Sequence, residues 1–418
     1  MIIRLWIMVL FLLLFPMMSC QDSGLKFSIT PEKDITDQPM CISLDGIDTD
    51  VSGLVLYRLE EGSLVEIPSQ VEQGADPKLW FYPGTDLKKG EEVKFVLKSE
   101  AGVSGPGNMK AQEDSENITL FAGDKEILSY RHAMIEAPEG TDPLYRKPGA
   151  YIHPLHSPAG KVLTRIQPPD HYHHYGIWNP WTLTFFEGRQ VDFWNLAEGQ
   201  GTVRYKGTLS TSSGDLFTGF KVLHEHVDFS ADDGEKVAMN EVWDVRAWQM
   251  EINDRPVWML DFVFTLSCAT DSLVNLAQYR YGGGIGFRAT ETWTNKNSTV
   301  LTSEGKTRAD ADASNAKWCM LSGETGADHT SGLIFMSHTG NRAHPEPMRV
   351  WPEDAVDGRG DLFFEFCPIR HEGWIINPGK EYVLKYRVFV YDGEIDAGTA
   401  ENLWQDYVQP LQITISEK

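Results

Sequence analysis

The sequence has few cysteines, little helical periodicity and, beyond its first 19 residues, no long hydrophobic run. Five cysteines occur in 418 residues and none of them forms a CxxC pair, which excludes a zinc ribbon and a thioredoxin-type redox site. No GxSxG or HExxH motif is present, so the sequence does not point to a serine hydrolase elbow or a zincin helix. We expect the four cysteines outside the N-terminal segment to be free thiols: Cys41, Cys268, Cys319 and Cys367. The alternative, in an exported protein, is oxidation to disulfides, for which the sequence leaves three pairings open.

Positive charge is also scarce. Lysine and arginine number 37 against 60 aspartates and glutamates, which gives a formal net charge of −23, and no block of basic residues stands out. Such a surface repels phosphate backbones and anionic lipids, so nucleic acid is excluded as a partner. Hydrophobic residues make up 41% of the chain and charged residues 23%, which is typical of a globular protein of two or three domains.

The N-terminal residues have the pattern of an export signal. Residues 1–19 contain one charge, Arg4, followed by an apolar run over 5–15 and then Ser19-Cys20. This is the charged, apolar and small-residue order of a signal peptide, and it is too short for a spanning helix. A cysteine at this place resembles the bacterial lipobox. We therefore expect lipidation at Cys20 and anchoring to the bacterial cell envelope, in the periplasm or at the outer membrane. The alternative is a plain secretory signal with an incidental cysteine.

The sequence after the signal peptide predicts β-structure. Short apolar runs separated by Gly-, Asp- and Lys-rich turns over residues 20–100 predict a small Ig-like β-sandwich. Residues 101–116 are rich in Gly, Ser and charge, which predicts a linker. Residues 117–418 predict a large antiparallel β-sandwich with one C-terminal helix. The fold class is thus all-β.

The spacing of apolar residues supports the prediction of long strands and one C-terminal helix. Apolar residues alternate with polar ones from Trp258 to Leu266, and 382–391 is a second β-branched and aromatic run. Ala400, Leu403, Trp404, Tyr407 and Val408 follow helical spacing, with Pro410 behind them. The Gly282–Gly286 segment lacks phosphate-loop spacing, and we interpret it as a tight turn or bulge before Phe287.

The best candidate for a site is a histidine-rich segment. Five of the twelve histidines fall between residues 153 and 174. Pro168–Pro169 disfavours a helix, so 170–174 should be extended or in a turn. If it is extended, His171 and His173 share one face and His174 points to the other. Imidazoles transfer protons near neutral pH, and a neighbouring carboxylate fixes their tautomer. The predicted catalytic residues are His171, His173, Asp170 and His153; the alternative is a structural hydrogen-bond network.

A metal ion is a further possibility at these histidines. His224-Glu225-His226, on an expected strand, supplies two histidines that would complete a four-nitrogen set with His171 and His173. No cofactor is firmly indicated, and a divalent metal at the histidine cluster is the alternative.

A family resemblance appears at the same residues. The pattern HPL-x-SP-x-G, then TR, then PPDH-x-HH-x-G-x-W, then DFWN resembles a bacterial family of unknown function labelled "methane oxygenase PmoA" or "PmoA family protein". The likeness covers roughly residues 115–395 and includes 284–288, 303–305, Trp318 and 338–345. Where the family usually has His-Pro-His-His-Arg, this chain has His171–Tyr175. We regard the label as a misnomer, because the methane monooxygenase subunit of that name is an integral membrane protein.

The resemblance implies a role in carbohydrate binding or processing, since the family's members look like exported proteins of polysaccharide-degrading bacteria. The long strands are also similar to the galactose-mutarotase-like supersandwich, by fold analogy. Two hypotheses follow: an enzyme with hydrolase, lyase or epimerase chemistry on a glycan-derived substrate, or a non-catalytic glycan-binding lipoprotein touching the membrane only through its anchor. A structural scaffold is a third. The predicted substrate-binding residues are Arg165, His174, Trp178, Asp192, Trp194, Asn195, Arg288, Asn341 and His344.

Overall fold

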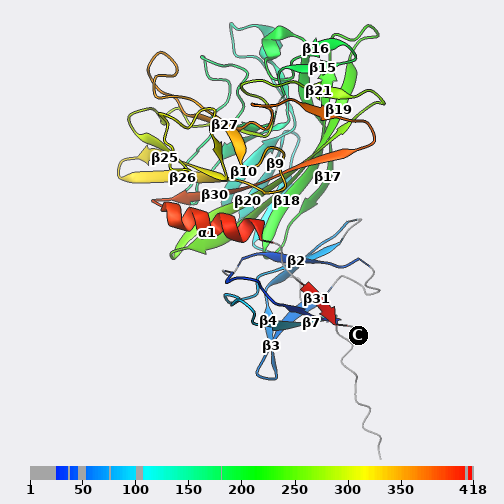
Figure 1. Ribbon diagram of the computed structural model, residues 1–418, viewed down its shortest axis with the longest axis vertical. Helices are drawn as coiled ribbons and strands as arrows, with labels where there is room; N and C mark the ends of the chain where they lie inside the picture. Colours follow the sequence, from blue (N-terminus) through cyan, green and yellow to red (C-terminus); the bar gives the residue numbers. More distant parts are fainter. Residues whose placement is uncertain are drawn as a thin grey trace, which may run out of the picture.

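The computed structural model describes residues 25–35, 38–45, 53–74, 77–99, 107–179, 181–409 and 413–416. The predicted signal peptide and Cys20 lie outside these residues. The regular structure is almost entirely β, in antiparallel sheets, as the sequence predicts (Figure 1). Within the described residues the single α-helix is α1 (Ala397–Val408), which Asp396 caps by accepting a hydrogen bond from the Thr399 amide.

The first part of the chain forms a small two-sheet sandwich. Its core contains Phe27, Leu56, Leu79 and Phe95, all almost fully buried. The three-stranded sheet is, in order, β2 (Met40–Ser43), β6 (Lys78–Phe81) and β5 (Ser69–Glu72). The five-stranded sheet is β31 (Ile413–Ser416), β1 (Leu25–Ile29), β7 (Val93–Ser99), β3 (Leu54–Glu60) and β4 (Ser63–Ile67).

Two large sheets make up the second part and pack face to face over one core. The eight-stranded sheet is β17 (Gly201–Ser212), β18 (Phe217–Asp228), β19 (Lys236–Ile252), β20 (Arg255–Cys268), β30 (Glu381–Asp392), β26 (His329–Ser337), β25 (Trp318–Gly326) and β23 (Ser298–Thr302). The nine-stranded sheet is β24 (Asn315–Ala316), β27 (Glu346–Val350), β28 (Phe363–Phe366), β22 (Ile285–Arg288), β14 (Ile177–Trp178), β13 (Tyr151–Leu155), β10 (Lys125–Arg131), β9 (Asn117–Ala122) and β8 (Met109–Glu113).

Smaller elements complete the second part. A four-stranded sheet consists of β16 (Arg189–Val191), β15 (Thr184–Phe186), β21 (Val274–Leu276) and β29 (Trp374–Ile376). The remaining elements are the pair β11 (Met134–Ile135) and β12 (Lys147–Pro148) and the 3-10 turns η1 (Pro143–Tyr145) and η2 (Leu196–Glu198).

The outer faces of the two large sheets have different coverings. Figure 1 shows α1 beside β30 and β20 of the eight-stranded sheet, with the small sandwich next to them. Trp248, Met259 and Phe389 of this sheet form one cluster with α1 and with Trp80 of the small sandwich. The outer face of the nine-stranded sheet carries a separate aromatic cluster that includes Trp178, Trp194, Trp351 and Phe363. Strand alternation explains this division, because Ile177, Phe287 and Phe364 point inward to the core while their neighbours Trp178, Arg288 and Phe363 point outward.

Two expected boundaries differ from the structure. The stretch 101–116, expected to be a linker, contains β8, which pairs with β9 along Met109–Glu113, so this half belongs to the nine-stranded sheet. The C-terminal strand β31, expected in the large domain, pairs instead with β1 of the small sandwich. β8 is placed by a hairpin with β9, the next strand in the chain, and β31 by pairing with β1 at the other end of the chain. Composition encodes neither pairing.

Other expectations are confirmed. Trp258, Leu260, Phe262, Phe264 and Leu266 are buried on one face of β20. The four described cysteines are free thiols, two buried and two partly buried. Gly282, Gly283 and Gly284 all have positive φ and turn the chain into β22. None of the helices in the described part of the chain has the length and apolar character needed to cross a membrane.

Candidate functional site

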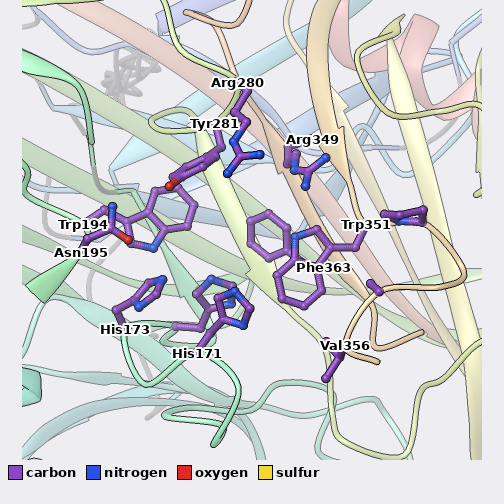
Figure 2. A pocket seen from close by; sticks show the side chains of 13 residues that line it. His171, His173, Trp194, Asn195, Arg280, Tyr281, Arg349, Trp351, Val356 and Phe363 are labelled. Carbon is purple, nitrogen blue, oxygen red and sulfur yellow. The ribbon is translucent and has the colours of Figure 1, made fainter. Parts of the chain in front are cut away.

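A cavity of about 410 Å³ opens on the outer face of the nine-stranded sheet (Figure 2). Its walls come from segments far apart in the chain: the turn between β13 and β14, the residues before η2, the residues before β22, and the end of β27 with the loop that follows it. The lining residues are His171, His173, His174, Trp194, Asn195, Arg280, Tyr281, Arg349, Trp351, Pro352, Ala355, Val356 and Phe363.

The histidine segment is a turn and not a strand. The amide of His171 donates to the Pro168 carbonyl over 2.9 Å, and the amide of His174 donates to the His171 carbonyl over 3.0 Å. The expected alternation of an extended segment is therefore lost. All three imidazoles gather at the cavity, with ring centroids of His171 4.7 Å from His174 and 5.4 Å from His173.

Asp170 and His171 form a carboxylate–imidazole pair. His171 Nδ1 lies 2.8 Å from Asp170 Oδ2, and the His171 side chain keeps 36% exposure. Burial alone would raise the pKa of Asp170, but hydrogen bonds and charges from His171 and Arg288 outweigh it and hold this pKa below its ordinary value. The carboxylate is thus ionised, so Nδ1–H of His171 donates to it and the tautomer is fixed. The Nε2 atom has no hydrogen-bond partner among the described residues.

A buried ion cluster supports Asp170 from below. The fully buried guanidinium of Arg288 donates to Asp170 over 2.7 Å and to Asp361 over 2.8 Å. Arg165 donates to both carboxylates as well. Burial first, and then the nearby Arg165, lowers the pKa of Arg288 to about 10, which leaves it charged at neutral pH. Two arginines thus face two aspartates, and Asp170 is held rigidly.

His173 and His174 differ from His171 in their surroundings. Burial, then the charges of His171 and Arg288, lowers the pKa of His173 to about 3. His174 is 2% exposed, and burial with His173 and Arg288 places its pKa well below the ordinary value. Both rings are therefore neutral at physiological pH. They offer hydrogen bonds and packing to a ligand, and they do not supply a proton.

Aromatic side chains form the remaining walls. Trp351 lies over the Arg288 guanidinium, with the ring centroid 4.5 Å from Cζ, and its ring centroid is 4.7 Å from that of His171. Trp194 packs edge-on to Tyr281 at 5.0 Å. Figure 2 shows the histidines along one side of the cavity and Arg280 with Arg349 along the other. The arrangement combines aromatic faces, an oriented imidazole and two cations.

Several predicted residues lie near the cavity without lining it. Arg165 and Arg288 sit beneath it in the ion cluster. Trp178 is 2% exposed and packs under His174 at 5.2 Å, so it is not available for stacking on a ligand. Asp192 accepts hydrogen bonds from the Trp194 and Asn195 amides and from the Asn195 side chain, and so shapes the wall.

Three predicted residues lie elsewhere. His153 Nδ1 bonds to the Thr164 hydroxyl at 2.9 Å, and burial followed by the charge of His156 lowers its pKa to about 4. Asn341 is buried and donates to Glu346 over 3.1 Å and to a backbone carbonyl over 2.8 Å. His344 is stacked at 5.9 Å on Trp404 of α1. The resemblance to a family sequence pattern does not show which of these residues lie close together in the folded chain.

The four-nitrogen metal set does not form. His224 and His226 are fully buried on β18, where Tyr130 lies 2.7 Å from His224 Nε2 and Glu241 lies 3.0 Å from His226 Nε2. These two rings belong to the core between the large sheets and not to the cavity. Within the described ranges, no three or more His, Cys, Asp or Glu side chains are grouped so as to hold a metal ion.

The sequence did not indicate eight of the thirteen residues that line the cavity, five of which are arginine or aromatic residues. Arg280, Tyr281, Arg349, Trp351 and Phe363 line it without having been predicted. A weak signal existed, because Arg280 and Tyr281 directly precede the glycine turn and Trp351 precedes a proline. The decisive information is the pairing of β28 with both β22 and β27, which brings these segments together.

Comparison with solved structures finds only distant similarity. The chain resembles a protein in glycosyl hydrolase family 38 from Enterococcus faecalis (8% identity, TM-score 0.41, covering 94% of this chain and 47% of that one). It also resembles an alpha-mannosidase from Enterococcus faecalis V583 (7% identity, TM-score 0.41, covering 94% and 46%). The chain thus spans about half the length of these structures. Comparison with curated proteins gives no match.

Family comparison covers most of the chain. Residues 117–405 match a family described as "Family of unknown function (DUF6807)". The match spans the two large sheets apart from β8, the cavity and most of α1. The chain therefore belongs to the DUF6807 family.

Proposed function

We propose that the cavity binds a carbohydrate or glycan-derived substrate and that His171, oriented by Asp170, performs acid–base chemistry on it. The observation that carries this proposal is the 2.8 Å contact between Asp170 and His171 at the edge of an aromatic-walled cavity. The carboxylate fixes the tautomer in which Nε2 has a free lone pair, as a general base requires. Trp194 and Trp351 are 3% and 8% exposed, so they offer only part of each ring to the cavity, as an apolar wall beside a sugar.

The lining chemistry favours lyase or epimerase reactions over two-carboxylate hydrolysis. Hydrolysis of the common type needs two carboxyl groups flanking the glycosidic bond. Among the described residues that line the cavity there is no aspartate or glutamate. A histidine base takes a proton from a carbon next to a carbonyl, and the electron pair moves onto the carbonyl oxygen. Delivery of a proton from water to the other face completes an epimerisation, and His171 then releases the first proton to water. In an elimination, the carbonyl re-forms, the electron pair makes a C=C bond, and the group on the neighbouring carbon leaves with its bonding electrons and takes up a proton.

A non-catalytic glycan-binding lipoprotein is the alternative function. The walls provided by Trp194, Tyr281 and Trp351 support it equally. The two functions differ in what they require of His171: a catalyst needs its Nε2, whereas a binding protein tolerates its replacement by another polar side chain.

Product analysis separates these functions. The mature protein is incubated with oligosaccharides and their 3-keto derivatives, with and without a chelator, and products are read by mass spectrometry. We expect His171→Gln to lower turnover by at least about 100-fold with an unchanged melting temperature. His173→Gln should lower it by less, since that ring is already neutral.

The matched control is His329→Gln. His329 also pairs with a carboxylate, Asp392, at 3.0 Å, but lies outside the cavity. Its replacement should leave turnover unchanged. Sugar binding without any product, unchanged in His171→Gln, would replace the enzyme with the binding function.

We also propose that the chain is exported and anchored through a lipid on Cys20. The support is the order of Arg4, the apolar run and Ser19-Cys20. Replacement Cys20→Ala should move the protein from the membrane pellet to the soluble fraction, as measured by fractionation and immunoblotting. Cys41→Ala is the control and should stay in the pellet. If Cys20→Ala also remains in the pellet, the anchor is not at this residue.

A further inference from the structure

The cavity has the opposite charge to the molecule as a whole. The chain carries a formal net charge of −23, with 60 acidic residues. Yet the cavity lining, within the described residues, includes two arginines, Arg280 and Arg349, and no carboxylate. The two aspartates beneath it, Asp170 and Asp361, are balanced by Arg165 and Arg288. The cationic side of the cavity is therefore a local feature of a chain that is acidic overall.

Arg280 is a cation without an acidic partner. It is exposed, and it forms no ion pair with an aspartate or glutamate among the described residues. Its guanidinium carbon lies 5.3 Å from the ring centroid of Tyr281, which also lines the cavity. Figure 2 shows the Arg280 side chain on the same side of the cavity as Arg349. The aromatic contact holds the cation at the cavity without neutralising it.

Arg349 is only partly neutralised. Its guanidinium donates to Asp312 over 2.7 Å, but the same carboxylate oxygen also accepts a bond from Arg370 over 2.9 Å. Glu365 of β28 lies opposite Arg349 of β27 in the strand register. Glu365 is fully buried, and this burial raises its pKa well above the ordinary value. Burial thus disfavours a negative charge on Glu365. At Asp312, one carboxylate faces two guanidinium groups, so it balances only one of their two charges.

We propose that the cavity recognises a carbohydrate that carries a carboxylate, a uronic acid, with Arg280 and Arg349 binding the anion and the sugar ring lying against the wall that Trp194 and Trp351 help to form. The proposal rests on the carbohydrate function above and specifies its substrate class. A planar guanidinium matches a carboxylate in a two-bond geometry, which gives direction as well as attraction. In the elimination or epimerisation considered above, the same two cations lie where the carboxylate would gain negative charge.

The test compares an acid with its own ester. Short oligogalacturonides and their methyl esters have the same sugar framework and differ in charge, so isothermal titration of both against the full mature protein isolates the anion. We expect the acid to bind at least about tenfold more tightly than the ester, with the difference shrinking as salt rises. Arg280→Gln should remove most of this difference, and Arg280→Lys should restore part of it. Arg255→Gln, an exposed arginine of β20 outside the cavity, should leave it unchanged.

Each result has one meaning. Equal affinity for acid and ester overturns the uronic-acid assignment and leaves the carbohydrate function standing. Failure of oligogalacturonides, oligoglucuronides and neutral oligosaccharides alike to bind overturns both. A preference for the acid that survives both Arg280→Gln and Arg349→Gln places the anion elsewhere and overturns the role of these arginines. Melting curves of each variant identify any loss of fold, and Arg280, being exposed, is the replacement that least disturbs it.

Discussion

Asp170 links two parts of the site that have different tasks. One oxygen, Oδ2, accepts both from Arg288 at 2.7 Å and from His171 at 2.8 Å. The first contact belongs to a buried ion cluster, and the second orients a half-exposed ring at the cavity. Replacing a single member of a buried ion pair is strongly destabilising, because the charge of the other member is left buried and unpaired. The position of His171 therefore depends on residues that no ligand touches.

The first prediction concerns the buried side of this cluster. Replacement Arg288→Met leaves Asp361, which is 2% exposed, with one buried cation fewer, and we expect a loss of about 3–5 kcal/mol in the free energy of unfolding. Arg359 contacts the same carboxylate at 3.3 Å but is 46% exposed, so Arg359→Met should lose less than about 1 kcal/mol. Urea unfolding of both variants measures the difference. Equal losses would mean that burial of the ion pair does not govern its contribution.

At the scale of elements, the glycine turn before β22 positions one wall of the cavity. Gly283 has a φ of +79°, and a Cβ built on it would lie 2.0 Å from the Trp181 ring. Trp181 is fully buried and has no room to yield. The turn therefore needs glycine for two reasons, backbone conformation and close packing, and it delivers Arg280 and Tyr281 to the cavity.

The second prediction separates these reasons. Gly305 has a similar φ of +74° and no atom within 4 Å of a built Cβ, so Gly305→Ala carries the backbone strain alone, about 1 kcal/mol. Gly283→Ala adds the clash and should lose roughly 1–3 kcal/mol more, together with ligand affinity. Thermal melts and ligand titrations of the pair provide the comparison. If the two alanine variants melt alike, Trp181 does move aside.

The elements also explain how far sequence alone reaches. Alternation from Trp258 to Leu266 predicts a strand with one buried face, because side chains of a strand alternate irrespective of its partners. The crowding of histidines likewise indicates the site. Whether His171 and His174 share a face depends on turn hydrogen bonds, and the arrival of Arg349 depends on the pairing of β27 with β28. That pairing sets Arg349 opposite Glu365, 16 positions away, and the pairing of β14 with β22 joins Ile177 to Phe287, 110 positions away. No local pattern records either partner.

At the scale of the whole molecule, an ion pair joins the small sandwich to the large sheets. Glu72 of β5 accepts from Arg246 of β19 over 2.7 Å and from Trp80 over 2.8 Å. Burial would raise the pKa of Glu72, but the charge and hydrogen bonds of Arg246, with Trp80 and Lys221, lower it to about 2. The folded protein thus holds the ionised form more strongly than the unfolded chain does.

The third prediction follows from the sign of this shift. Since the folded pKa lies below the unfolded value of 4.5, the contribution of Glu72 is present above about pH 4.5 and is lost as pH falls toward 2. Glu72→Gln should lower the free energy of unfolding by on the order of 2–3 kcal/mol at pH 7. Urea titrations at several pH values measure the difference in the free energy of unfolding between the unchanged protein and the Glu72→Gln variant. This gap should narrow below pH 4.5. A gap that stays constant down to pH 3 would exclude ionisation of Glu72 as its source.

The two parts of the molecule are also joined by aromatic packing. Trp248 of β19 is fully buried, with its ring centroid 5.2 Å from that of Trp80 and 6.4 Å from that of Tyr82. Gln70 of β5 accepts from the amides of Leu216 and Phe217 at 2.9 and 3.1 Å. The strands β8 and β31 cross the expected boundaries in addition. The small sandwich is therefore a cover for the large sheets as well as a separate core.

The last prediction tests that dependence. A fragment beginning at Glu116 lacks β8, which leaves the edge of β9 unpaired, and it exposes Trp248 and Phe217 to water. Each large aromatic side chain contributes on the order of 2–3 kcal/mol when it is removed from water, so the fragment should melt earlier, bind a hydrophobic dye and aggregate. A fragment beginning at Gly107 keeps β8 and should recover part of this stability, while the intact mature chain melts highest and binds no dye. Calorimetry and dye fluorescence on the three proteins rank them. A fragment from Glu116 that stays soluble, melts cooperatively at the temperature of the intact chain and excludes the dye would show that the large sheets need no cover.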